Sequence, residues 1–71
     1  MGTHVIEIVV RGRLGPELIA VFDGYTVSDE GGFTSIVGRI PDQARLLGLL
    51  EMLDELHVEV VSVNPVPTDI G

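Results

Sequence analysis

The pattern of hydrophobic and polar positions divides the chain into four segments typical of strands. From Thr3 to Arg11 the apolar residues are mostly β-branched and fall on both faces, as in a central strand. Tyr25 to Asp29 and Phe33 to Ile40 flank the glycine-rich turn Asp29-Glu30-Gly31-Gly32, which predicts a β-hairpin. Val58 to Val63 predicts the last strand.

A short helix is expected between the first two strands. Pro16 suits the first position of a helix, where a missing N–H costs nothing, and Leu14 and Leu18 recur at helical spacing. The alternative is a single helical turn or an extended segment over residues 17–22. That alternative would turn the fold into a β-meander with one helix.

The longest helix is expected over about Asp42 to Leu56, directly after Pro41. At about 100° per residue, five leucines fall within one broad arc, and acidic and amide side chains lie opposite. We expect this arc to pack on the sheet. Its members are Leu46, Leu49, Leu50, Leu53 and Leu56.

The element order β-α-β-β-α-β predicts an α+β fold of the ferredoxin-like, or split βαβ, type. Its four-stranded antiparallel sheet would have the order 4-1-3-2, with two helices on one face. Seventy-one residues allow one domain with a thin core. We therefore predict a single α+β domain over residues 1–67 and a flexible C-terminal tail over residues 68–71, because Pro65 and Pro67 end regular structure.

Charge and composition exclude several classes of function. Eleven acidic residues against four arginines give a net charge of −7, and the chain has only three aromatic residues, so we expect no nucleic-acid partner. No apolar run approaches the roughly 18 residues that span a bilayer, and we expect no membrane partner. Cysteine is absent, which favours the cytoplasm and excludes disulfides and thiolate metal sites.

Several stretches resemble a group of uncharacterised proteins of about this size that are common in actinobacteria. They are Ile36 to Leu50 with its continuation to Val63, Arg11 to Pro16, and Phe22 to Gly24. These stretches are structural: a helix start, a leucine face and a turn. The resemblance implies no activity. Arginine used without any lysine also fits a high-GC genome.

Histidine is the first residue to consider for catalysis or metal binding, and the chain has His4 and His57. The predicted topology places them at opposite ends of the sheet, so one subunit cannot easily join them in a metal site. His57 should lie at the end of the long helix, where a cation interacts favourably with the helix dipole. We predict no catalytic residue, no metal ligand and no cofactor.

A mixed-charge cluster is expected at the end of the sheet that carries His57. Arg11 and Arg13 should meet the Asp29-Glu30 turn beside the start of the first helix, a geometry that can bind a small anion. Solvated ion pairs are the simpler interpretation of the same residues. The candidate ligand-binding residues are Arg11, Arg13, His57 and Tyr25.

The apolar second face of the first strand favours a protein–protein contact. Helices can cover only one side of the sheet, so the other side should expose several valines, as interfaces do. We expect a small non-catalytic interaction or oligomerisation module, an accessory or regulatory protein that acts as a homo-oligomer or with a protein partner. Glu7 of one copy could meet Arg11 of the other across a twofold axis. The expected interface residues are Val5, Glu7, Val9, Arg11, Val61 and Val63.

The alternative function is a small-molecule-binding protein or a small enzyme with a pocket formed in a ferredoxin-like dimer. Its pocket would lie between sheet and helices and be lined by Phe22, Tyr25, Phe33 and Leu14. An enclosed cavity with a few inward polar groups would favour this function. A filled core with a flat apolar outer face would favour the interaction module.

Overall fold

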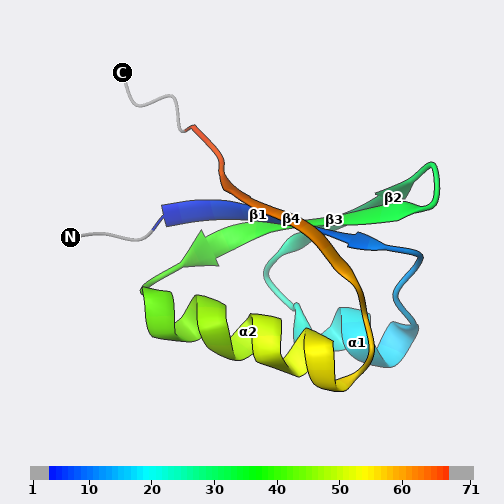
Figure 1. Cartoon of the computed structure of the whole chain (residues 1–71). Helices are drawn as coiled ribbons and strands as arrows, with labels where there is room; N and C mark the ends of the chain where they lie inside the picture. Colours follow the sequence, from blue (N-terminus) through cyan, green and yellow to red (C-terminus); the bar gives the residue numbers. More distant parts are fainter. Residues whose placement is uncertain (1–3, 68–71) are drawn as a thin grey trace.

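The computed structural model describes residues 4–67, which form one antiparallel sheet and two helices. The strand order is β2-β3-β1-β4, which is β4-β1-β3-β2 when it is read from the other edge. Both helices lie on the same side of the sheet (Figure 1). The predicted α+β class, the four-stranded antiparallel sheet and the two helices are confirmed. The elements are β1 (His4–Arg11), α1 (Pro16–Val21), β2 (Thr26–Glu30), β3 (Phe33–Ile40), α2 (Gln43–Glu55) and β4 (Val60–Pro65).

The predicted domain, residues 1–67, extends three residues beyond the described part at its N-terminus. The predicted tail, residues 68–71, lies wholly outside the described residues. Neither helix of the described part is long and apolar enough to cross a membrane.

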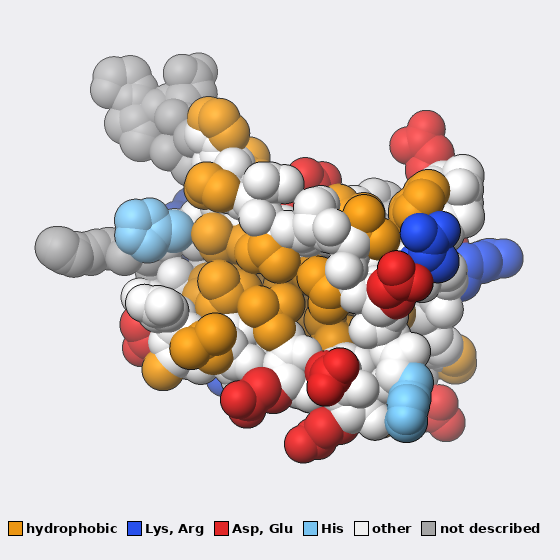
Figure 2. Space-filling model, in the orientation of Figure 1, with side chains coloured by type: hydrophobic (Ala, Val, Ile, Leu, Met, Phe, Trp, Pro, Cys, Tyr) orange, Lys and Arg blue, Asp and Glu red, His pale blue; other side chains and the backbone are white. Residues whose placement is uncertain are grey.

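The core lies between the helices and one face of the sheet. Ile8 of β1 pairs with Ile36 of β3, so the two side chains share that face and pack together. Seen from the β4 side, hydrophobic side chains reach the surface between β4 and α2 (Figure 2). A chain this short therefore encloses its core only in part. The buried hydrophobic residues are Ile8, Val10, Phe22, Ile36, Ile40, Leu49 and Leu53.

Helix α2 buries its leucine face less completely than the spacing predicts. Leu49 and Leu53 are buried, and Leu46 and Leu50 are half-buried against the same core. The prediction for Leu56 is wrong, because its side chain is 55% exposed. Leu56 is the C-cap residue, where the helical spacing that placed it on the arc ends.

Helix α1 is short, but it is a helix. It runs from Pro16 at its first position to Val21, which excludes the extended segment considered for residues 17–22. The helix itself contributes no fully buried side chain. Its C-cap residue Phe22 is 1% exposed and carries the aromatic ring of the core. The segment thus anchors the crossover from β1 to β2 through the residue that ends the helix.

The end of α2 explains why β4 begins two residues later than predicted. The N–H of Val58 donates to the Leu53 carbonyl at 2.9 Å, and the N–H of His57 donates to the Asp54 carbonyl at 3.0 Å. These are the two bonds of a Schellman motif, with His57 at a left-handed φ of 61°. Val58 is thus used to close the helix, and regular pairing starts at Val60.

Strand β4 also contains a β-bulge that the sequence pattern does not show. Val60 pairs with Val10, whereas Ser62 pairs with Val9, so Val61 is an extra residue on β4. Pairing continues to Pro65, beyond the predicted end of the strand. β4 is an edge strand, where a proline is tolerated because its missing N–H faces away from the sheet.

Candidate functional site

The predicted ligand-binding residues do not form one cluster. Arg11 pairs with Phe33 at the last position of β1, and we call this end of the sheet the Arg11 end. Arg13 follows directly, and His57 lies two residues before Glu59, whose carbonyl accepts from the Arg11 N–H at 2.9 Å. Val5 pairs with Arg39 at the opposite end of the sheet, which we call the Arg39 end. Tyr25 directly precedes β2 near this end.

Arg11 is engaged within its own chain. Its Nε lies 3.0 Å from Glu59 Oε1, and its guanidinium carbon lies 5.3 Å from the centroid of the Phe33 ring. Both partners of the ion pair are more than half exposed, with side-chain exposures of 58% and 64%. Such a pair contributes about 0 to 1 kcal/mol and organises the surface more than it stabilises the fold.

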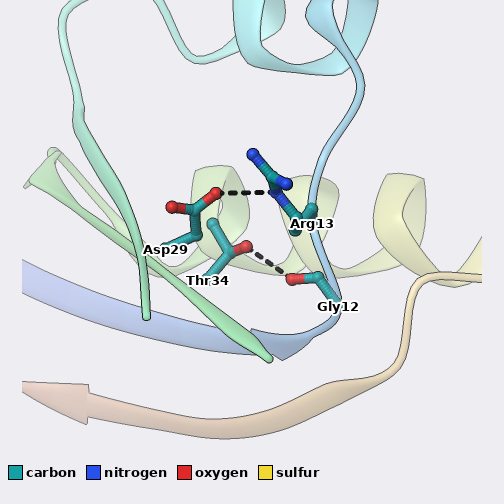
Figure 3. Close-up of polar contacts among 4 residues, drawn as sticks. All are labelled: Gly12, Arg13, Asp29 and Thr34. Atoms are coloured by element: carbon teal, nitrogen blue, oxygen red, sulfur yellow. Dashed lines mark hydrogen bonds and ion pairs between the residues drawn. The ribbon is translucent and has the colours of Figure 1, made fainter. Parts of the chain in front are cut away.

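Arg13 belongs to a set of polar contacts that joins the loop after β1 to the β2–β3 hairpin. Its Nε donates to Asp29 Oδ2 at 3.0 Å, and Thr34 Oγ1 donates to the Gly12 carbonyl at 2.6 Å (Figure 3). The N–H of Gly12 donates in turn to the Gly32 carbonyl at 2.7 Å. The structure thus gives both predicted anion-binding arginines an acidic partner, as the simpler interpretation expects.

Thr34 is a structural residue that the sequence reasoning missed. Its side chain is 1% exposed, and its hydroxyl bonds the loop carbonyl described above. The available signal was its position, because Thr34 occupies the core-facing side of β3 in alternation with Ile36. A threonine at a core position needs a hydrogen-bond acceptor nearby.

The two histidines lie apart, as predicted. His4 is exposed at the start of β1, where it pairs with Ile40, whereas His57 is the Schellman residue after α2. Within residues 4–67 no group of three or more His, Cys, Asp or Glu side chains is placed to hold a metal ion.

The side of the sheet without helices carries three of the six predicted interface residues, Val5, Glu7 and Val9. We call this surface the open face, formed by Val5, Glu7 and Val9 of β1 with Ser35 and Val37 of β3. All five residues are half-buried. Ser35 Oγ donates to Glu7 Oε2 at 2.8 Å, so the central acidic side chain already has a partner on this face.

The structure corrects the prediction for the interface residues of β4. Val63 pairs with Ile8 and packs against the core, so it does not belong to the open face. The cause is the bulge, because one extra residue shifts the alternation along the strand. Val61 is the extra residue and is 44% exposed. The apolar area of the open face is therefore smaller than the sequence predicts.

The predicted pocket residues do not line one cavity. Phe22 is buried in the core, and Tyr25 packs against it edge-to-face with ring centroids 5.4 Å apart. Phe33 lies at the Arg11 end, and its side chain is 38% exposed under Arg11. Leu14 packs against the core. The set is divided between the interior and one end of the sheet.

A depression at the Arg39 end brings together residues from several elements. Its lining includes Tyr25, Thr26, Gly38, Arg39 and Arg45, together with Val5 and Val37 of the open face, and we call it the Tyr25 notch. Only Tyr25 among them is a predicted ligand-binding residue. The depression thus combines the start of β2, the end of β3 and the first turn of α2.

Comparison with known proteins adds a family but no activity. No curated protein and no solved structure matches the chain. A family model described as "Domain of unknown function (DUF8691)" matches residues 5–64, from β1 into β4. This agrees with the resemblance to proteins that have no assigned activity. Because the match covers most of the sequence, the chain belongs to the DUF8691 family of domains of unknown function.

Proposed function

We propose that the protein is a small non-catalytic interaction module that acts as a homo-oligomer, in which the open face of one copy packs on that of another. The observation that carries this proposal is the one-sided arrangement of the helices (Figure 1). It leaves Val5, Val9 and Val37 on the uncovered side of the sheet. Contiguous apolar side chains on the surface of a small protein are typical of an interface.

The charges beside these valines are compatible with burial. Glu7 accepts the hydroxyl hydrogen bond from Ser35, and Arg11 pairs with Glu59. Burial of a charge is expensive chiefly when the charge loses its partners. Contact between two open faces therefore leaves neither group isolated, and the twofold pairing of Glu7 with Arg11 expected from the sequence is not required.

The size of the open face sets the expected strength of association. The whole side of the sheet without helices, of which the open face is the central part, measures roughly 500 Å² from strand spacing and rise per residue. Two such faces bury about 1,000 Å², at the low end of specific interfaces. We therefore expect a dimer that dissociates on dilution.

The finer features of the proposal follow from the fold and the composition. We propose that the fold is ferredoxin-like, which the strand order read from the β4 edge and the two helices on one side support. We also propose an accessory or regulatory role. A location in the cytoplasm fits the absence of cysteine. An actinobacterial source fits the use of arginine without lysine.

Light scattering after size exclusion, over a range of protein concentrations, tests the proposal. The wild type is expected to dimerise at micromolar concentration, and Val9→Asp to be monomeric, because it places a charge at the centre of the contact. Added salt should strengthen the wild-type dimer, because it screens the repulsion between two chains of charge −7.

Leu47→Asp is the matched control for Val9→Asp. Leu47 is 50% exposed on α2, away from the open face, so this variant adds the same charge and should stay dimeric. A wild type that is monomeric at every concentration and salt level contradicts the proposal. So does a dimer that Val9→Asp and Leu47→Asp weaken equally.

A further inference from the structure

The Tyr25 notch exists because β3 is longer than its neighbour β2. The pairing of these strands ends where Thr26 meets Val37, and β3 continues through Arg39 to Ile40 without a β2 residue beside it. The chain then enters the first turn of α2, which carries Arg45, and Arg45 lines the same depression. The result is a concave site open to solvent at the edge of the sheet.

One wall of the notch is held in place by close packing. The Tyr25 ring lies so near Gly38 that a Cβ at this position would overlap ring atoms. Phe22 supports the Tyr25 ring from the core, with an angle of 86° between the ring planes. Within residues 4–67, no hydrogen bond engages the Tyr25 hydroxyl, which is therefore a donor available to a ligand.

The cations of the notch differ from the other cations of the chain. Among the described residues, the ion pairs are those of Arg11 with Glu59 and of Arg13 with Asp29. Arg39 and Arg45 take part in neither pair, and both line the notch. In a chain of net charge −7, a depression lined by two arginines that have no ion-pair partner among the described residues is a candidate site for negative charge.

Two carboxylates limit what the notch can hold. Asp23 lines the same depression, and Asp42 Oδ1 accepts from the Arg45 backbone N–H at 2.8 Å as the N-cap of α2. These groups oppose a large or highly charged anion, such as a nucleic-acid backbone. Asp23 is also an acceptor for a hydroxyl or ammonium group of the ligand.

We propose that the Tyr25 notch binds a small oxyanion, a carboxylate or phosphate group of a small molecule, through the guanidinium groups of Arg39 and Arg45. The Tyr25 hydroxyl donates to the same anion, and Asp23 accepts from the rest of the ligand. The site needs no residue from a second copy, but it adjoins the open face, because Val5 and Val37 line both surfaces.

Amide chemical shifts of the full chain test the site, with inorganic phosphate and acetate as separate probes and sodium chloride as the ionic-strength blank. We expect saturable shifts at Gly38, Arg39 and Arg45, with a dissociation constant on the order of millimolar. The stronger of the two probes shows whether the notch prefers a phosphate or a carboxylate. Arg39→Gln and Arg45→Gln should each weaken binding about tenfold, the loss of one charge-assisted pair.

Arg13→Gln is the matched control, because it removes the same charge from the opposite end of the sheet. It should leave the affinity within about twofold, since the long-range effect of one screened charge is small. All three variants remove exposed side chains, and unchanged thermal melts will show that each stays folded. Equal weakening by all three variants, or no saturable shift at the notch up to about 50 mM of either probe, overturns the proposal.

Discussion

The two ends of the sheet use the same residue types in opposite ways. At the Arg11 end, Arg11 and Arg13 pair with Glu59 and Asp29, and the Thr34 hydroxyl binds the loop between them. At the Arg39 end, Arg39 and Arg45 line a depression and take part in neither of those ion pairs. At one end the arginines are paired within the chain, and at the other they take part in no ion pair among the described residues.

The difference follows from how the chain turns at each end. The Arg11 end contains the tight β2–β3 turn, which brings Asp29 back beside the loop that carries Arg13 (Figure 3). At the Arg39 end, the pairing of β2 with β3 ends at Thr26 and Val37, and no tight turn joins the two strands there. The Tyr25 ring packs against Gly38 instead. The short β2–β3 turn brings Asp29 within reach of Arg13. Where β2 and β3 separate, no acidic side chain of the described residues forms an ion pair with Arg39 or Arg45.

The largest effect on stability is expected from Gly38→Ala at the Arg39 end. The new methyl group must displace the Tyr25 ring, and such overpacking costs about 1 to 3 kcal/mol. Chemical denaturation of the two proteins measures the loss. In a Tyr25→Ala background the penalty should vanish, and a penalty that persists there contradicts the packing argument.

Gly48→Ala provides the matched control for this substitution. Gly48 lies in α2, and a Cβ there has open space around it. The same change should therefore stabilise the protein by up to about 1 kcal/mol, because alanine is the better helix former. The two substitutions are expected to have opposite signs.

Thr34→Val tests the contacts that close the Arg11 end. Valine keeps the shape of threonine but leaves the Gly12 carbonyl without its donor, at a cost of about 1 to 2 kcal/mol in unfolding free energy. Thr26→Val, at an exposed position of β2, should change stability by less than about 0.5 kcal/mol. Equal effects at the two positions would show that the hydroxyl bond of Thr34 does not stabilise this end.

The smallest effect is expected from His57→Gly, and it should be a gain. A side chain at a left-handed φ is strained, so glycine at this Schellman position should stabilise the chain by about 1 kcal/mol. His57→Ala keeps the strain and should give no gain. A loss of stability with both variants would mean that the imidazole makes a stabilising contact.

Hydrophobic spacing predicts the elements of this fold because most of them bury one face. The strand Phe33–Ile40 has the predicted bounds, and the short helix begins at Pro16 as predicted. The boundaries of β4 were wrong, because a residue at left-handed φ and an added residue in a strand are features of the backbone. No side-chain pattern records them, and the error moved Val63 from the core to the predicted interface.

The candidate site was harder to predict than the fold. The sequence predicts a mixed-charge cluster at the Arg11 end. The structure places Arg13 beside Asp29 there, as an ion pair. The Tyr25 notch depends on Arg39 and Arg45, which lie on different elements and become neighbours only through the turn into α2. Spacing along the sequence cannot reveal this neighbourhood, because it arises where two strands separate.

The bulge at Val61 also bears on how the protein avoids fibre formation. An edge strand offers unpaired backbone groups to which a strand from another molecule can add, and repeated addition gives amyloid-like growth. β4 is such an edge, but Val61 interrupts its regular spacing and Pro65 removes an N–H donor. A chain with an incompletely enclosed core thus carries, on an edge strand, two backbone features that oppose open-ended polymerisation.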